Sequence, residues 1–104
     1  MAEEQQLTDE ELDEQFRAMI DKFIDHANEF AEVESIENVG MALLYAASRF
    51  NSFVVSQHAK SLEAYQADIP QAKAFFVKQY EEMLDENLED YEQVFHKYSH
   101  LTKK

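Results

Sequence analysis

The sequence contains no cysteine, and only one glycine and one proline among its 104 residues. Without cysteine the chain can form neither a disulfide framework nor a zinc or redox site built on thiolates. Strands joined by hairpins need turn residues repeatedly, and one glycine and one proline are too few to supply them. The same shortage excludes phosphate-cradling loops, dinucleotide-binding turns and nucleophile elbows. We therefore expect an all-α fold, and the sequence carries no signal of an enzyme.

Basic residues are also scarce: nine Lys and Arg stand against 22 Asp and Glu, for a net charge of -13. Affinity for DNA or RNA depends on Lys and Arg neutralising phosphates, so we expect no direct nucleic-acid binding. The charge also disfavours an anionic membrane surface, and no apolar run reaches the ~20 residues of a membrane span. The first residues, MAEEQQLTDEELDEQ, are acidic and polar, unlike a signal or transit peptide. We expect a cytoplasmic protein that does not bind membranes.

Metal-binding patterns are missing as well. Di-iron helical bundles use Glu-x-x-His pairs, and none of the four histidines follows an acidic residue by three positions. An EF-hand loop needs a glycine at its sharp turn, and the single glycine is at position 40. We expect neither a metal nor another cofactor.

Apolar residues, in contrast, are plentiful: they make up 45% of the chain, enough for the core of a single domain of this length. The stretch GMALLYAASRFNSFVVSQHA, residues 40–59, has no acidic residue and is apolar around most of its circumference. Such a helix has to be covered on most sides. We interpret it as the central helix of a bundle, with Asn38 as its N-cap, alanines that let neighbouring helices approach closely, and an end between Ala59 and Ala67.

Two amphipathic helices are predicted on either side of this stretch. Thr8 and Glu11 have the spacing of a capping box, which predicts a helix from there to about Glu34. Pro70, in the sequence Asp68-Ile69-Pro70, predicts the first turn of a third helix that runs to near the C-terminus. The apolar residues of both recur at steps of three and four. In the first helix they are Leu12, Phe16, Met19, Ile20, Phe23, Ile24, Ala27, Phe30 and Ala31.

Together these elements predict a three-helix, up-down-up bundle of long helices, because a short break forces the next helix to run antiparallel. We expect a flexible lead over residues 1–7, a single helical-bundle domain over 8–98 and a flexible tail over 99–104. Two neighbouring helices can cover only part of the surface of the central helix. If its apolar surface extends beyond that part, the uncovered apolar side chains must contact another chain. A homodimer is therefore an open alternative.

Acidic residues gather in the third helix, with no basic residue between Lys78 and Lys97. Four like-charged pairs stand four residues apart and destabilise the helix by ~1–2 kcal/mol together. A solvated acidic face is the ordinary explanation; the functional one is a surface that binds a basic protein. The candidate interaction surface consists of Glu81, Glu82, Asp85, Glu86, Glu89 and Asp90.

Arg49 is the only charged residue within the central stretch. An arginine there can fix the register of the helices through an ion pair, its methylenes packing on the core. The alternative is a ligand pocket formed with Tyr45 and Asn51. Counting along antiparallel helices places four carboxylates about level with Arg49: Asp21, Asp25, Asp85 and Glu86.

The run ALLYAASRFNSFV, followed by FFVKQYEEMLDENLEDY, resembles a family of small bacterial proteins, found mainly in proteobacteria, that is catalogued as a domain of unknown function. The resemblance covers about Phe16 to Tyr91. It implies a helical protein without an assigned activity and transfers no site residues.

The functional prediction is a non-enzymatic protein-interaction module with an acidic surface, whose partner is another protein; a basic partner would complement that surface. One alternative is an acidic decoy of nucleic acid that binds a DNA-binding protein. The other is a small-molecule binder or enzyme with a pocket near Tyr45, Arg49 and Asn51.

Overall fold

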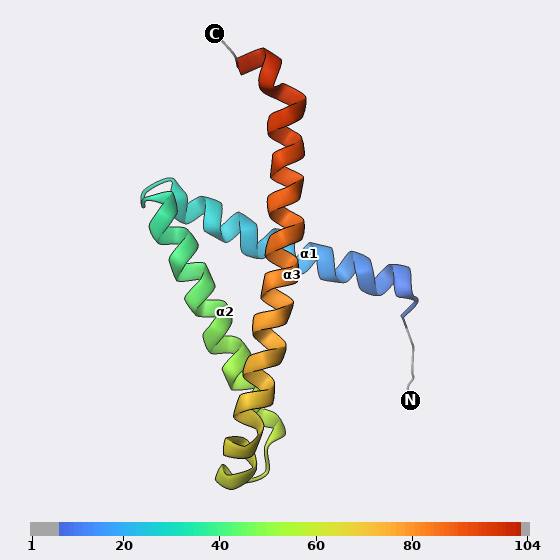
Figure 1. Ribbon diagram of the computed structural model, residues 1–104, viewed down its shortest axis with the longest axis vertical. Helices are drawn as coiled ribbons and strands as arrows, with labels where there is room; N and C mark the ends of the chain where they lie inside the picture. Colours follow the sequence, from blue (N-terminus) through green and yellow to red (C-terminus); the bar gives the residue numbers. More distant parts are fainter. Residues whose placement is uncertain (1–6, 103–104) are drawn as a thin grey trace. The chain divides into compact units, whose positions relative to one another are not determined.

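The computed structural model describes residues 7–102, and their side chains as far as Lys97. It contains three α-helices, α1 (Asp9–Ala31), α2 (Ile36–His58) and α3 (Leu62–Thr102), and no strand among these residues (Figure 1). The prediction of an all-α fold with three long helices is confirmed. Residues 1–6 and 103–104 of the predicted lead and tail lie outside the described part of the chain.

The chain divides into two units at Asn51 and Ser52, inside α2. Unit 1 contains α1 and α2 as far as Asn51, and unit 2 contains the end of α2 and all of α3. Each unit is therefore a pair of helical segments joined by a short turn. The single domain over residues 8–98 stays a prediction.

The start of α1 agrees with the predicted capping box. The Glu11 N–H donates to Thr8 Oγ1 at 3.1 Å, and the Thr8 N–H donates to Glu11 Oε1 at 2.9 Å. Two backbone donors that the helix cannot pair are thus satisfied by side chains. Asp9 and Glu10 add negative charge to the positive end of the helix dipole. The helix ends at Ala31, slightly before the predicted Glu34.

The predicted N-cap of α2 is wrong. Ser35, not Asn38, precedes the helix, and its Oγ accepts the Asn38 N–H at 3.1 Å. Serine and asparagine cap helices about equally well, so the serine nearer the preceding turn prevails. The helix ends at His58, before the range in which its end was predicted.

The predicted start of α3 is also wrong. Ser61 accepts the Ala64 N–H on its Oγ at 3.1 Å, so α3 begins at Leu62 and Pro70 lies inside it. The helix therefore contains a proline, which lacks an N–H and crowds the carbonyl four residues before it. The stretch assigned to the end of α2 is instead a short turn and the start of α3.

Burial contradicts the predicted cover of the central helix. No described residue is buried, and Leu43, Phe50 and Phe53 are 37%, 64% and 51% exposed. The reason lies in the number of neighbours: within a unit, each helical segment has one other segment beside it. A single neighbour covers one face, whereas α2 is apolar on most sides.

Candidate interaction surfaces

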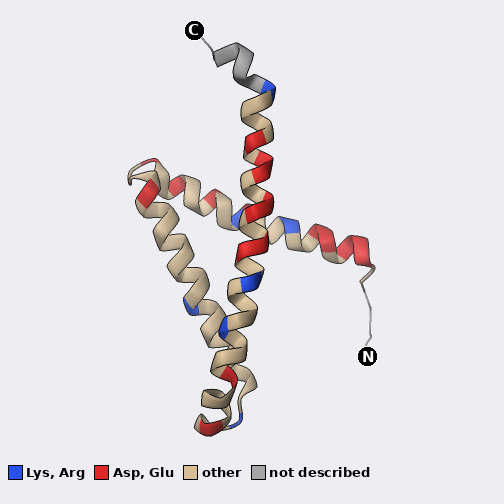
Figure 2. Ribbon diagram, viewed as in Figure 1, with Lys and Arg blue, Asp and Glu red and all other residues tan. Residues whose placement is uncertain are grey.

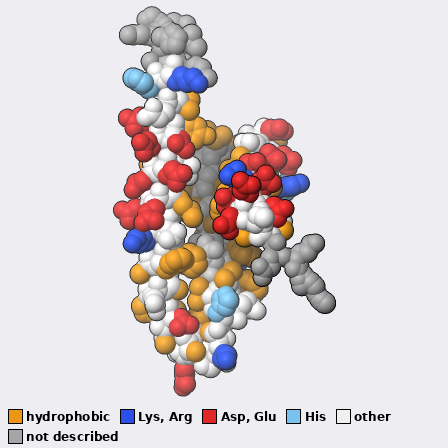
Figure 3. Space-filling model, turned by 90° about the vertical axis from the view of Figure 1, so that its right-hand side faces the viewer, with side chains coloured by type: hydrophobic (Ala, Val, Ile, Leu, Met, Phe, Trp, Pro, Cys, Tyr) orange, Lys and Arg blue, Asp and Glu red, His pale blue; other side chains and the backbone are white. Residues whose placement is uncertain are grey.

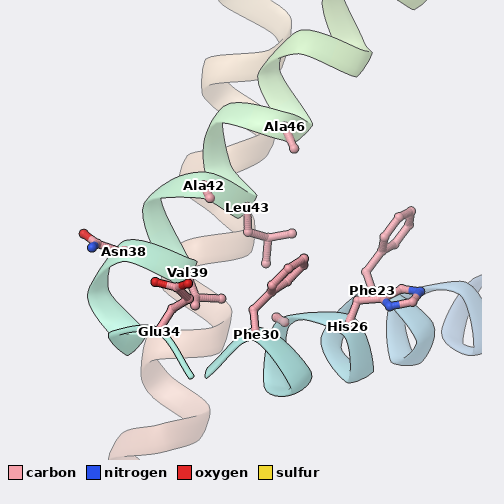
Figure 4. A pocket seen from close by; sticks show the side chains of 10 residues that line it. Phe23, His26, Phe30, Glu34, Asn38, Val39, Ala42, Leu43 and Ala46 are labelled. Atoms are coloured by element: carbon pink, nitrogen blue, oxygen red, sulfur yellow. The ribbon is translucent and has the colours of Figure 1, made fainter. Parts of the chain in front are cut away.

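An apolar groove lies within unit 1, between the end of α1 and the start of α2 (Figure 4). Its volume is about 490 Å³. Phe30 of α1 and Leu43 of α2 are directed into the same space, and the short side chains of Ala42 and Ala46 lie on the α2 side (Figure 4). We call this feature the unit 1 groove; it is lined by Phe23, His26, Ala27, Phe30, Glu34, Asn38, Val39, Ala42, Leu43 and Ala46.

The spacing of these residues along each helix explains why they share the groove. Residues three and four apart lie on one face of a helix, and both walls follow this spacing. Alanine fills little space, so α2 leaves a hollow where Ala42 and Ala46 oppose the larger side chains of α1. Glu34 and Asn38 place polar groups at the turn end of the groove. An apolar hollow with a few polar groups is typical of a binding site.

The α1 wall of the groove continues toward the N-terminus as a row of exposed apolar side chains. From Leu12 to Phe30 there are 18 steps of 1.5 Å, so this row extends for about 27 Å. Exposed apolar surface of this extent marks interaction sites in soluble proteins. We call it the α1 stripe; its residues and exposed fractions are Leu12 49%, Phe16 56%, Met19 55%, Phe23 63% and Phe30 61%.

The acidic residues of α3 form a second exposed surface. Glu81, Glu82, Asp85, Glu86, Glu89 and Asp90 are all exposed. None of them forms an ion pair among the described side chains. Figure 2 colours acidic positions red along the middle of α3, and Figure 3 shows red acidic side chains along the same helix. We call these six residues the α3 acidic face. Its carboxylates are free to attract a basic partner.

Tyr45, Arg49 and Asn51 lie on α2 within unit 1, and none of them lines the unit 1 groove. Tyr45 is 66% exposed and Asn51 is half-buried. Arg49 forms no ion pair with a described carboxylate of its own unit, Asp21 and Asp25 included. The register ion pair and the ligand pocket stay predictions. If Arg49 forms the register ion pair, Arg49→Met should lower the melting temperature of the protein.

Metal ligands do not cluster: no group of three or more His, Asp or Glu side chains suited to a metal ion occurs in the part of the chain that the structure describes. His26 Nδ1 lies 3.4 Å from Glu29 Oε1, and both side chains are exposed. None of the described helices combines the length and the apolar character that crossing a membrane requires.

The unit 1 groove was not predicted from the sequence. Its alanines were interpreted as positions of close helix approach, and the pairing of α1 with α2 instead leaves a hollow beside them. The signal was the combination of small residues on one helix with phenylalanines at matching spacing on the other. Recognising it requires the angle between the helices, which sequence periodicity does not contain.

The helices and surfaces define an all-α protein of three long helices that exposes an apolar groove and an acidic helix face. The chain belongs to a family described as "Protein of unknown function (DUF3144)", which matches residues 16–92. The predicted resemblance to a family of unknown function is thereby confirmed over almost the same residues, and the proteobacterial source stays a prediction. No curated protein and no solved structure matches the chain.

Proposed function

We propose that this chain is a non-enzymatic protein-interaction module whose unit 1 groove and α1 stripe bind a helical segment of a protein chain. The observation that carries the proposal is the exposure of large apolar side chains along one face of unit 1, with Phe16, Phe23 and Phe30 each more than half exposed. Burying one such side chain stabilises a complex by about 1.5–3 kcal/mol, so a few of them suffice for specific binding.

The shape of the surface favours a helix as the ligand. Groove-binding helices insert apolar residues at spacings of three and four into a hydrophobic channel. The unit 1 groove is open and apolar; of its three polar lining residues, Glu34 and Asn38 lie toward the turn and His26 lies beside Phe23 on α1.

The test is a capture experiment with the immobilised chain. A lysate of the source organism, which contains untagged copies of this protein as well as other proteins, is passed over it, and the proteins that bind are identified. Phe23→Glu places a charge in the groove, and Phe95→Glu makes the same change on α3, where Phe95 is 76% exposed. We expect Phe23→Glu to lose proteins that Phe95→Glu retains. The retained proteins are then purified and titrated by calorimetry. Equal capture by both variants contradicts the proposal.

The decoy of nucleic acid remains a second candidate, supported by the exposure of the α3 acidic face. On a helix, rows of carboxylates four residues apart repeat every 6 Å or so and present negative charge in a line. A decoy competes with nucleic acid for its target. Two results favour the decoy over the groove. Duplex DNA releases the captured proteins, and a variant with lysines in the α3 acidic face no longer captures them.

The ligand pocket near Tyr45, Arg49 and Asn51 makes a different prediction. A small molecule that binds the folded state raises its melting temperature by mass action. A thermal-shift screen with metabolites therefore tests this alternative. A hit that Arg49→Met abolishes supports it, and the absence of any hit counts against it.

A further inference from the structure

We propose that the partner of the unit 1 groove and the α1 stripe is a second copy of this chain, in an antiparallel and twofold-symmetric pairing of two α1–α2 hairpins. The inference rests on the proposed function, because it names the protein that binds the same surface. It is argued from the spacing of the stripe, the exposed area and the distribution of charge.

The α1 stripe has the spacing of a helix that packs against other helices along its whole length. The steps between Leu12, Phe16, Met19 and Phe23 alternate between four and three residues. Phe30 continues the pattern after one polar position, His26. This alternation is the a and d pattern of a heptad repeat, whose seam runs along one side of the helix. Ile20 and Ala27 occupy a third apolar position of the heptad, next to a and d, as in helices that face the core of a bundle.

A two-helix hairpin cannot enclose a core, whereas two hairpins face to face form a four-helix bundle. A twofold axis brings the same surface of both copies together, so the surface must complement itself. In the antiparallel arrangement the axis lies level with Asp21, halfway between Leu12 and Phe30. Leu12 then opposes Phe30 of the second copy, and Met19 opposes its Phe23. Leu12 and Met19 thus face phenylalanines along the α1 seam, and Phe16 lies level with His26, while the alanines of α2 leave the room that these side chains need.

The exposed area is of the size that a stable dimer needs. An aromatic side chain presents about 150–250 Å² when fully exposed, so three phenylalanines that are about 60% exposed offer roughly 300–450 Å² per chain. A standard interface buries about 800 Å² on each partner. The remaining half comes from the aliphatic residues of the stripe and of the groove, of which Leu12, Met19, Ile20 and Leu43 are 49%, 55%, 42% and 37% exposed.

The distribution of charge selects the antiparallel orientation. The start of α1 is acidic, and its first basic residue is Arg17. A parallel pairing places these acidic segments of the two copies side by side, and Arg17 beside Arg17. The antiparallel pairing separates the two acidic segments by roughly 30 Å along the axis, beyond the ~8 Å screening length of physiological salt, and brings Arg17 of each copy level with Asp25 of the other. It also brings Glu29 and Glu32 level with Asp13 and Glu10, a repulsion that added salt screens. The acidic residues at the start of α1 are Asp9, Glu10, Glu11, Asp13 and Glu14.

Sedimentation velocity of the full-length chain between roughly 1 and 100 μM tests the pairing. We expect a species of twice the 12.2 kDa of one chain, and a stronger association in added NaCl, which screens the repulsion between two acidic copies. Phe23→Glu removes two buried side chains per dimer and should raise Kd about 100- to 10,000-fold. Phe95→Glu, with the same change of charge, should leave Kd within a few-fold of the wild type.

A wild-type mass of 12.2 kDa over the whole range overturns the self-pairing. If such a monomer still captures another protein through Phe23, the proposed function stands without it. A dimer that Phe23→Glu does not weaken, in a variant whose circular dichroism is still helical, also overturns the pairing by this surface. Should Phe23→Glu lose its helical signal, Phe16→Glu, which lies outside the groove, repeats the test.

Discussion

Replacing Asp85 by lysine should stabilise α3, because Asp85 lies among other carboxylates. Glu81 and Glu89 stand four residues away on either side, and Glu82 stands three residues away. All four are exposed and lie on the α3 acidic face. Like charges at these spacings destabilise a helix by about 0.2–0.5 kcal/mol per pair, and opposite charges stabilise it by a similar amount. Each pair that changes sign loses one repulsion and gains one attraction, so three pairs together contribute about 1–3 kcal/mol in favour of the folded state.

Asp68→Lys is the matched control, since it makes the same replacement in the same helix. The residues three and four positions from Asp68 are uncharged, so the variant changes net charge and helix propensity without changing a charged pair. We expect its free energy of unfolding to stay within about 0.5 kcal/mol of the wild type. The neighbours in question are Ala64, Tyr65, Gln71 and Ala72.

The assay is thermal unfolding followed by circular dichroism at one protein concentration, in low salt and in about 1 M NaCl. A gain of about 1–3 kcal/mol corresponds to a rise in Tm of roughly 5–20 °C for a domain of this size. We expect Asp85→Lys to exceed Asp68→Lys by that amount in low salt, and salt to raise the Tm of the wild type and reduce the difference. Equal Tm values for the two variants, or a wild-type Tm that falls steadily with salt, refute the reasoning.

Three further stability predictions concern backbone features and use the same unfolding assay. Ser61→Ala removes the cap of α3 and should lower the free energy of unfolding by about 1 kcal/mol, whereas Ser52→Ala, inside α2, should not; equal effects of the two contradict the cap. Thr8→Ala removes the capping-box oxygen of α1 and should cost about 1 kcal/mol, and an unchanged Tm argues against that cap. Pro70→Ala restores a backbone donor inside α3 and should raise stability by about 1–2 kcal/mol; a lower Tm contradicts this.

Periodicity and the capping box predicted the helices well, since both act within a few residues. The apolar steps of three and four predicted α1, and Thr8 with Glu11 predicted its start. The boundaries at Ser35 and Ser61 were missed because several residues with capping or starting character compete there. Only the hydrogen bond that forms shows which one prevails. Pro70 is tolerated inside α3 because the helix extends for many residues on its C-terminal side.

The candidate site was less predictable because it depends on which faces the helices leave open. The sequence of α2 shows that most of its circumference is apolar. The spacing of residues within one helix does not show which other segment covers each face. Leu43 and Phe30 illustrate this, since both belong to predicted apolar faces and both line an open groove. The α3 acidic face was simpler: charged residues at helical spacing remain exposed, as they are here.

Pairs of nitroxide labels measure directly whether two α1 helices meet, since the chain has no cysteine and one introduced cysteine labels each copy once. Asp21→Cys and Glu14→Cys lie on the same face of α1, seven residues apart. Dipolar coupling should appear in both samples, with a longer distance at position 14, where the axial separation is about 21 Å instead of near zero. Uncoupled spins in both samples would contradict the claim that a second copy covers this surface.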